Sequence, residues 1–150
     1  MKLCLACSAG GHLSEMSQLR EIYLKHNHFF ITFKRNDSIE LMRKENVFFV
    51  IDPKRNPLLF LINFFQTLRI FLREKPDAII STGAGVAIAV CLIGKIFGKR
   101  VAFIESYCRI KEPSLSGKII YRLKGADLFL VQWKENLKFF PKAKYYGGVF

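Results

Sequence analysis

Residues 2–13, KLCLACSAGGHL, decide the fold of this 150-residue chain. After Lys2 the segment is apolar up to Cys7, and residues 8–11 then combine two small residues with two glycines. From Leu13 to Leu24 the apolar side chains recur at the spacing of one helix face. An apolar strand, a glycine turn and an amphipathic helix in this order are typical of the start of a βαβ unit. The segment therefore predicts an α/β domain that begins with a strand.

The same alternation continues along the chain. We predict strands at residues 29–33, 47–51, 78–81, 101–104 and 128–131, and helices at 38–44, 58–73, 86–97 and 114–123. Several of these strands are apolar throughout, as expected when helices cover both faces of a parallel sheet. No stretch has the composition of a linker. We therefore expect residues 1–150 to form a single domain with a doubly wound parallel sheet.

The charge of the chain favours an anionic partner. Lys and Arg total 24 against 12 acidic residues, which gives a formal net charge of +12. A field of this sign attracts a phosphate compound, a nucleic acid or an acidic membrane surface. An RNA-binding domain is one alternative, but the basic residues are not interleaved with a recognisable recognition motif. We therefore expect no nucleic-acid partner.

The cysteines favour reduced thiols in a cytoplasm, since no secretory leader precedes them. Cys4 and Cys7 have the C-x-x-C spacing, but residues three apart in a strand point to opposite faces, so we expect no metal site. The apolar residues 58–72 and 78–94 are both shorter than the roughly 20 residues that a membrane span needs. We expect neither segment to cross a bilayer.

Two glycine turns follow predicted strands, at residues 8–12 (SAGGH) and 81–85 (STGAG). Glycine amides at the start of a helix suit a phosphate, and two such turns at neighbouring strand ends would cradle one extended anionic group. The alternative is a pair of tight turns that only use the conformational freedom of glycine. The first turn departs from G-x-G-x-x-G, and residues 32–35 (TFKR) offer no acid for a ribose, so we expect no dinucleotide cofactor.

His12 and Glu105 are the candidate catalytic residues. His12 follows the glycines at the carboxyl edge of the sheet, where it could donate to a phosphate or accept a proton from a hydroxyl. Glu105 follows the strand at 101–104 and could bind a sugar hydroxyl or orient a base. The alternatives are an exposed histidine that completes a helix cap, and a loop ion pair of Glu105 with Arg109 or Lys111, which would stabilise little if exposed.

The predicted helix at residues 58–73 has more apolar side chains than one buried face needs. On a helical wheel one broad apolar face, expected to be buried, contains Phe60, Leu61, Phe64, Phe65, Leu68, Phe71 and Leu72. The opposite face, expected to be exposed and to contact an anionic membrane, contains Leu59, Ile62, Ile70, Arg69 and Arg73. The alternative is a helix that is covered on both sides.

The ordered set of motifs resembles a known family. It comprises residues 8–13 (SAGGHL), 81–85 (STGAG), 104–106 (IES) with Arg109, 127–133 (DLFLVQW) and 146–150 (YGGVF). Together these motifs, which cover nearly the whole chain, resemble the acceptor-side, membrane-recruiting subunit of two-component glycosyltransferases. That family includes the anchoring subunit of the dolichol-pathway N-acetylglucosaminyltransferase and bacterial exopolysaccharide subunits of the PssD/CpsF type.

The resemblance implies a Rossmann-like domain equivalent to the N-terminal half of a GT-B glycosyltransferase. It implies that this chain binds a polyprenyl-diphosphate-linked saccharide, while a partner chain binds the nucleotide sugar and transfer needs both. The diphosphate would be held by Gly10, Gly11, His12, Gly83, Ala84 and Gly85. By the same resemblance, His12 and Glu105 would face the acceptor hydroxyl.

Membrane and partner contacts complete these expectations. Eukaryotic members of the family begin with a membrane anchor, whereas this chain starts at its first strand, so membrane contact would rest on residues 58–72 and on basic charge. We expect a cytoplasmic protein that lies peripherally on the inner face of the membrane. The predicted partner interface is the apolar end of the chain, with Tyr146, Gly147, Gly148, Val149 and Phe150. A non-catalytic membrane scaffold that recruits a catalytic partner is the alternative function.

Overall fold

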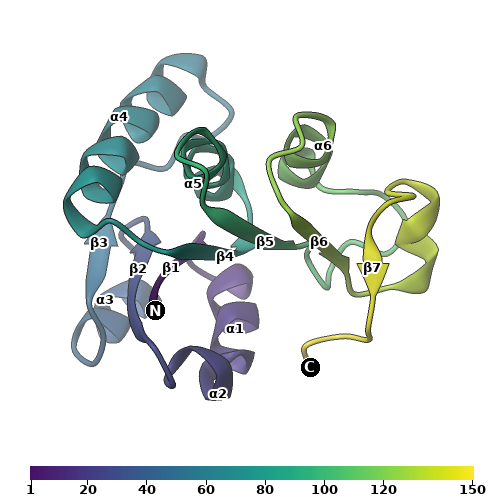
Figure 1. Ribbon diagram of the computed structural model, residues 1–150, viewed down its shortest axis with the longest axis horizontal. Coiled ribbons are helices and arrows are strands. Elements are labelled where there is room, and N and C mark those ends of the chain that lie inside the picture. The colour runs from purple at the N-terminus through teal and green to yellow at the C-terminus, as the bar shows by residue number, and fades with distance from the viewer.

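A computed structural model describes residues 1–150 and places β1 (Lys2–Cys7) near the middle of one seven-stranded sheet (Figure 1). The other strands are β2 (Asn27–Thr32), β3 (Val47–Phe49), β4 (Ala78–Gly83), β5 (Arg100–Ile104), β6 (Leu128–Val131) and β7 (Lys144–Tyr145). The strand order is β3-β2-β1-β4-β5-β6-β7, and every neighbouring pair is parallel. The order reverses between β1 and β4, which is the arrangement of a Rossmann-like sheet.

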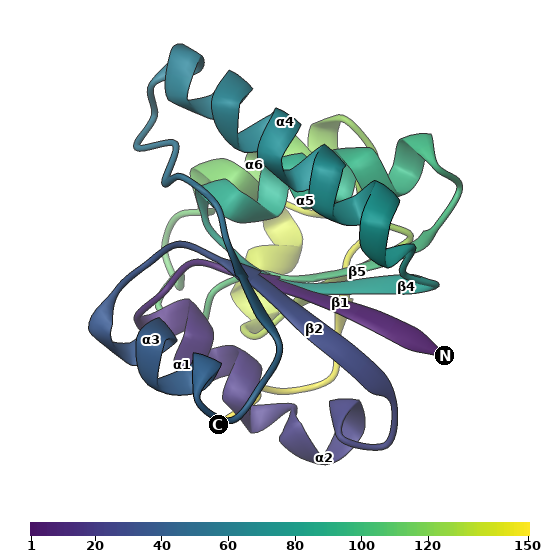
Figure 2. The same ribbon diagram turned by 90° about the vertical axis from the view of Figure 1, so that its left-hand side faces the viewer.

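Helices cover both faces of the sheet, as Figure 2 shows in side view. One layer contains α1 (Gly11–Gln18), α2 (Arg20–Tyr23) and α3 (Asn36–Met42). The other layer contains α4 (Pro57–Glu74), α5 (Gly85–Ile96) and α6 (Leu115–Arg122). A short 3-10 helix, η1 (Lys134–Lys138), precedes β7. The predicted doubly wound α/β fold is confirmed.

The main core lies between the sheet and the layer of α4, α5 and α6. The strands contribute side chains such as Phe29, Ile79 and Phe103, which are at most 1% exposed. They pack against the central helix α5, whose Val90 and Ile93 are fully buried. Burying these apolar side chains is the main contribution to the stability of this layer. It also fixes the position of the start of α5 at the carboxyl edge of the sheet.

The cysteine pair of β1 is buried in this sheet. Cys4 and Cys7 are both fully buried and both have free thiols. Burial raises the pKa of Cys7 to about 12. The thiols of β1 are therefore packing groups that stay protonated at neutral pH.

The orientation of α4 corrects the helical-wheel prediction. Leu59 and Ile70, expected to be exposed, are half-buried. The exposed apolar side chains of α4 are instead Leu58, Leu61, Ile62, Phe65 and Leu72, and the exposed basic ones are Arg69 and Arg73. Of the three apolar residues that the helical wheel placed on the exposed face, Leu59, Ile62 and Ile70, only Ile62 is exposed in the structure.

The cause of this rotation is the backbone of the β3–α4 connection. The Asn63 side-chain amide donates to the carbonyl oxygen of Ile51 at 2.7 Å, and the Gln66 side-chain oxygen accepts from the Ile51 amide at 2.7 Å. Asn63 is fully buried, and Gln66 bonds to Ile51 although it is exposed. These bonds to the Ile51 backbone direct this side of α4 toward the β3–α4 connection. No helix combines the length and the apolarity that a membrane crossing requires.

Candidate functional site

The two glycine turns meet where the strand order reverses. One follows β1 and leads into α1, the other follows β4 and leads into α5, and these helices lie on opposite faces of the sheet (Figure 2). His12 Nδ1 is 2.8 Å from the carbonyl oxygen of Thr82, and the Thr82 hydroxyl donates to the carbonyl oxygen of His12 at 2.7 Å. This pair of hydrogen bonds ties the turns together at the position where ligands bind in open α/β sheets.

The geometry around His12 fixes which ring nitrogen can act as a base. A carbonyl oxygen only accepts hydrogen bonds, so Nδ1 beside Thr82 is the protonated nitrogen of the neutral ring. The lone pair is then on Nε2. The ring lies over Gly83, where a β-carbon would be 3.2 Å from Nδ1. His12 thus has a fixed orientation and a free basic nitrogen, while its side chain remains 24% exposed.

A cleft of about 550 Å³ adjoins His12 and lies between the β3–α4 connection, the first turn of α4, and the helices α5 and α6. Its basic lining residues are Lys54, Arg55 and Arg109, against one acidic lining residue, Asp52. None of the three basic side chains has a carboxylate oxygen within 4.0 Å. Its apolar lining residues are Phe60, Ile88, Leu92, Leu115, Ile119 and Leu123, together with Pro53 and Pro57. The cleft therefore combines unpaired positive charge with an apolar wall.

Among the three helices that begin at this cleft, only α5 lacks a side-chain cap. The Asn56 side chain caps α4 by accepting from the amides of Leu58 and Leu59 at 2.9 and 3.3 Å. The Ser114 hydroxyl caps α6 by accepting from the Gly117 amide at 2.8 Å. At α5 the N-cap residue is Ala84, with φ 61° and ψ −162°, and no side chain accepts from the first turn. The N–H groups of this turn, with the positive end of the helix dipole, can bind an anion.

The glycines predicted to hold a diphosphate do not all reach this cleft. His12, Ala84 and Gly85 line it, whereas Gly10, Gly11 and Gly83 do not. The Gly10 amide donates to Oδ2 of Asp37 at 2.5 Å, so a carboxylate of α3 occupies the anion position at the start of α1. The Gly83 amide is directed to the Ser81 hydroxyl at 3.3 Å. The predicted cradle is therefore corrected to one helix start, that of α5.

The orientation of Glu105 also differs from the prediction. Its side chain is fully buried, and its carboxylate accepts from the Ser106 amide and from the Ser114 hydroxyl, each at 3.0 Å. Burial raises its pKa. The carboxylate therefore holds the segment between β5 and α6, and Glu105 does not line the cleft beside His12. Because it has no ion pair within 4.0 Å, the alternative of a loop salt bridge with Arg109 or Lys111 is wrong as well.

A second buried carboxylate, Glu15, was missed by the sequence reasoning. Its side chain is 2% exposed, and Oε1 accepts from the Ser106 hydroxyl at 3.0 Å and from the Tyr107 amide at 2.9 Å. Oε2 lies 3.9 Å from His12 Nδ1. Burial raises the pKa of Glu15, while these hydrogen bonds and the charge of His12 lower it. The signal in the sequence was the spacing, since a residue three positions after His12 lies on the same helix face.

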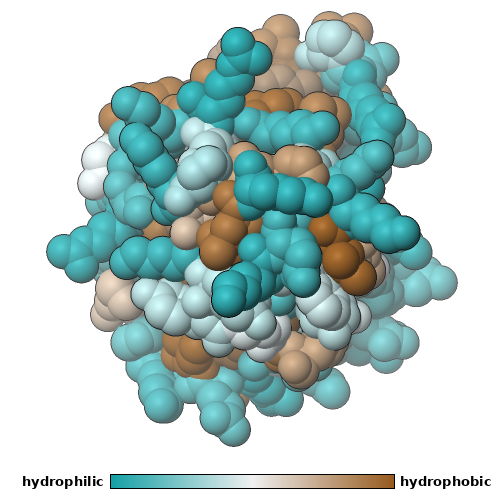
Figure 3. All heavy atoms as spheres, turned by 90° about the vertical axis from the view of Figure 1, so that its right-hand side faces the viewer, coloured by the Kyte–Doolittle hydropathy of each residue, from teal (hydrophilic) through white to brown (hydrophobic).

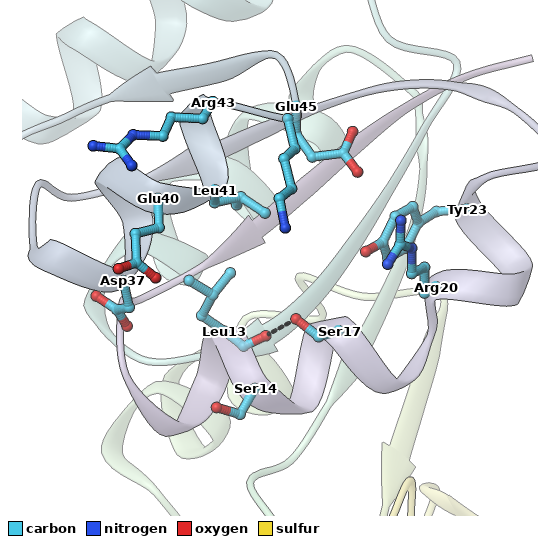
Figure 4. Close-up of a pocket in the computed structure, with 11 residues that line it drawn as sticks. Leu13, Ser14, Ser17, Arg20, Tyr23, Asp37, Glu40, Leu41, Arg43 and Glu45 are labelled. Atoms are coloured by element: carbon cyan, nitrogen blue, oxygen red, sulfur yellow. Dashed lines mark hydrogen bonds between the residues drawn. The ribbon is translucent and has the colours of Figure 1, made fainter.

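Another cavity, of about 480 Å³, lies between α1, α2 and α3 (Figure 4). Its three basic residues, Arg20, Arg43 and Lys44, are matched by the acidic residues Asp37, Glu40 and Glu45. The Ser17 hydroxyl, drawn with a dashed line in Figure 4, is bonded to the Leu13 carbonyl oxygen at 2.9 Å. The basic and acidic residues of this cavity are equal in number, so it attracts an anion less strongly than the cleft beside His12 does.

The last residues of the chain are held by the segment that follows Glu105. The Val149 backbone amide donates to the Gln132 side-chain oxygen at 2.9 Å, and the Gln132 side-chain nitrogen Nε2 donates to the Glu105 backbone carbonyl oxygen at 2.9 Å. The Phe150 ring lies 5.3 Å from the ring of Tyr107. Tyr146 is 77% and Phe150 63% exposed. On the side of the molecule shown in Figure 3, apolar side chains form separate patches between hydrophilic ones.

Comparison with known proteins gives one family match. Residues 54–149 match the model described as "Oligosaccharide biosynthesis protein Alg14 like". UDP-N-acetylglucosamine transferase subunit alg14 of Schizosaccharomyces pombe is 39% identical over 49% of this chain and 37% of its own length. The human subunit ALG14 is 35% identical over 51% of this chain and 38% of its own length. The Candida glabrata subunit is 28% identical, and the alignment covers 93% of this chain and 74% of that protein. The first two matches therefore cover well under half of those relatives.

Solved structures support the fold. MurG of Acinetobacter baumannii superposes with a TM-score of 0.76 at 15% sequence identity, over 99% of this chain and 46% of that one. UDP-N-acetylglucosamine 2-epimerase of Rickettsia bellii gives 0.78 at 14% identity, over 99% of this chain and 45% of that one. The chain thus has the Rossmann-like fold of slightly less than half of each of these proteins.

Proposed function

Because this chain belongs to the Alg14-like family of oligosaccharide biosynthesis proteins, we propose that it is the acceptor-binding, membrane-recruiting subunit of a two-chain glycosyltransferase. In this complex a partner chain binds the nucleotide sugar, and this chain binds a polyprenyl-diphosphate-linked saccharide. The relatives are UDP-N-acetylglucosamine transferase subunits by name, which supports both a partner chain and a UDP-sugar as donor.

The observation that carries the proposal is the cleft beside His12. An uncapped helix start and three unpaired cations line one space whose one acidic residue is Asp52, and this excess of positive charge suits the two phosphates of a diphosphate. We assign the diphosphate to the first turn of α5, at Ala84 and Gly85, with Lys54 and Arg55 as its cationic contacts. Arg109 lies on the loop that leads to α6 and lines the same cleft.

The apolar wall of the cleft supports a lipid-linked ligand. Ile88 and Leu92 are one turn apart on α5, and Ile119 and Leu123 are spaced in the same way on α6. These two pairs line the same cleft as the basic residues Lys54, Arg55 and Arg109. A ligand with an anionic head and an apolar chain satisfies both ends, whereas a free phosphate compound would leave the apolar wall without a partner.

In the proposed reaction His12 is the general base. Its Nε2 accepts the proton of the acceptor hydroxyl while the hydroxyl oxygen attacks the anomeric carbon of the sugar donor. A bond forms between that oxygen and the anomeric carbon, and the bond from the anomeric carbon to the nucleotide phosphate breaks. Glu105 contributes by holding Ser114 and the start of α6 at one wall of the cleft. The partner must supply the second wall, because both reactants have to be held within reach of each other.

Membrane recruitment is assigned to the exposed face of α4. Its apolar side chains, Leu58, Leu61, Ile62, Phe65 and Leu72, lie on the helix layer that also forms the cleft. Arg69 and Arg73 add positive charge for an anionic surface. We propose peripheral attachment of the chain to the inner face of the membrane through this surface. The exposed residues at the end of the chain, Tyr146 to Phe150, are the proposed contact with the partner.

A binding experiment on the isolated chain tests the acceptor site. Farnesyl diphosphate is the probe, compared with inorganic diphosphate and farnesol by titration calorimetry. We expect farnesyl diphosphate to bind at least about tenfold more tightly than either half, which corresponds to roughly 1.4 kcal/mol. Arg55→Ala should weaken binding of both diphosphates and leave farnesol unaffected, whereas Arg43→Ala, in the cavity of Figure 4, should change neither. Equal affinity for farnesol and farnesyl diphosphate would refute the diphosphate site.

A second experiment separates the catalytic subunit from the non-catalytic scaffold. His12→Ala should leave partner binding and folding intact and lower sugar transfer by the reconstituted pair about 10²–10⁴-fold, the range of general-base contributions. His26→Ala is the control, because His26 does not line the cleft. Transfer within twofold of wild type in the His12 variant would favour the scaffold.

A further inference from the structure

We propose that Glu15 is a positioning residue that acts through His12, an inference that rests on the sugar transfer proposed above. The two side chains lie one turn apart on α1, with Glu15 Oε2 3.9 Å from His12 Nδ1. Glu15 is buried and does not line the cleft, whereas His12 does, so the carboxylate does not touch the substrate.

The hydrogen bonds of Glu15 are unequally divided between its two oxygens. Oε1 accepts from both Ser106 and Tyr107, whereas the buried Oε2 has no hydrogen-bond partner. A buried carboxylate oxygen without a partner is costly unless a positive charge compensates it. No lysine or arginine nitrogen lies within 4.0 Å of this carboxylate, and His12 is its one ion-pair neighbour. The cation that Oε2 can stabilise is therefore protonated His12.

The titratable groups around Glu15 lead to the same assignment. They are His12 on its own helix, Cys7 at the end of β1, and Glu105 and Tyr107 in the segment after β5. Burial raises the pKa of Cys7 to about 12, so this thiol is uncharged at neutral pH. Glu105 can only be neutral or negative. Among these groups, His12 alone can become positive.

This arrangement makes the effect of Glu15 larger during the reaction than before it. When Nε2 accepts the proton of the acceptor hydroxyl, the ring carries a positive charge that the carboxylate beside it attracts. Before that proton arrives the ring is neutral, so the attraction is small. An interaction that strengthens as the proton moves raises kcat with little effect on acceptor binding. Thr82 fixes the orientation of the ring, and Glu15 supplies the charge.

A purely structural role is the competing explanation, because Glu15 also ties α1 to Ser106 and Tyr107. Two substitutions separate the roles. Glu15→Gln removes the charge and keeps an amide oxygen that can accept from both donors. Ser106→Ala keeps the charge and removes one of the two donors. A structural role predicts the larger defect in Ser106→Ala, which loses one of these hydrogen bonds. A role through His12 predicts a kinetic defect in Glu15→Gln that Ser106→Ala does not share.

The test measures kcat, the KM for a lipid-linked acceptor, and the pH profile of the chain reconstituted with its partner. For Glu15→Gln we expect kcat to fall about tenfold or more with KM within about twofold, and the acid limb of kcat to move to lower pH because the negative charge beside the ring is lost. Ser106→Ala should lower the thermal midpoint and leave the acid limb in place. A wild-type kcat at every pH in Glu15→Gln would overturn the proposal.

A measurement on the isolated chain keeps the two proposals distinguishable. Absence of transfer by the wild-type pair would count against the proposed function. The pKa of the Glu15 carboxyl, followed by carbon-13 NMR, tests its coupling to His12 without any transfer. His12→Gln should raise this pKa further above the ordinary value, because the His12 charge that lowers it is lost. An unchanged Glu15 titration would refute the coupling even if the pair is active.

Discussion

The carboxylate of Glu105 lies so close to Gly117 that a β-carbon at position 117 would be 1.8 Å from Oε2. Only glycine in the first turn of α6 leaves room for this buried acid. Gly117→Ala should therefore destabilise the chain by about 1–3 kcal/mol, the usual cost of overpacking, in urea unfolding. Gly11→Ala is the matched control in the first turn of α1, where an added β-carbon meets nothing within 4 Å. Equal stability of the Gly117 variant and wild type would show that Glu105 can move aside.

The raised pKa of Glu105 predicts how stability depends on pH. Burial places the pKa of the folded state above that of the unfolded chain, so between the two values the folded state binds more protons. Stability should then fall as pH rises from the ordinary glutamate range through the raised value. Each unit of difference corresponds to about 1.4 kcal/mol.

Glu105→Gln removes this titration and leaves that of Glu15 in place. The free energy of unfolding of wild type, measured relative to the variant from pH 4 to 8, should therefore decrease with rising pH and then level off. Parallel curves for the two proteins would contradict a raised pKa at Glu105.

The exposed face of α4 predicts the membrane contact. Replacing Leu61, Phe65 and Leu72 by Ser should weaken binding to anionic vesicles by about tenfold or more, because apolar area is then no longer removed from water. Thermal stability should be unchanged. The matched control replaces Ile22, Leu24 and Met42, which are equally exposed on the other helix layer. Added salt should weaken vesicle binding through Arg69 and Arg73. An equal loss of binding in both triple variants would assign the membrane contact elsewhere.

The sequence predicted the fold well because each main element has a local signal. Apolar runs between glycine, proline and polar residues mark β1 to β6, and Pro57 and Gly98 mark the ends of helices. The strand β7 was missed, since Lys144 and Tyr145 show no apolar run and pair only because β6 offers a free edge. The break between α1 and α2 at Leu19 was missed as well.

The sequence indicated those lining residues of the cleft that lie in the turns after strands. His12 and Gly85 lie at the starts of the helices that follow β1 and β4, and both line the cleft. The Gly10 amide is bonded to Asp37, 27 residues away in sequence, and no local pattern indicates that this amide already has a partner. The orientation of Glu105 depends on Ser114 and on the space above Gly117, which no local pattern reveals. Long-range contacts of this kind decide whether a polar group faces a ligand or the protein.

The last prediction concerns the proposed partner contact at the end of the chain. Tyr146 follows β7 at the open edge of the sheet and is 77% exposed, with no hydrogen bond from its hydroxyl to the protein. An exposed tyrosine at the centre of an interface can contribute about 2 kcal/mol or more to binding. Tyr146→Ser should therefore weaken a pull-down of the nucleotide-sugar-binding partner without lowering the thermal midpoint. Ile96→Ser, at a side chain 71% exposed on α5, is the control and should bind the partner like wild type. Loss of binding in the control but not in Tyr146→Ser would move the interface to α5. The wild-type chain supplied alone with UDP-sugar and lipid-linked acceptor should give no product, because in the proposed complex the partner supplies the second wall of the cleft.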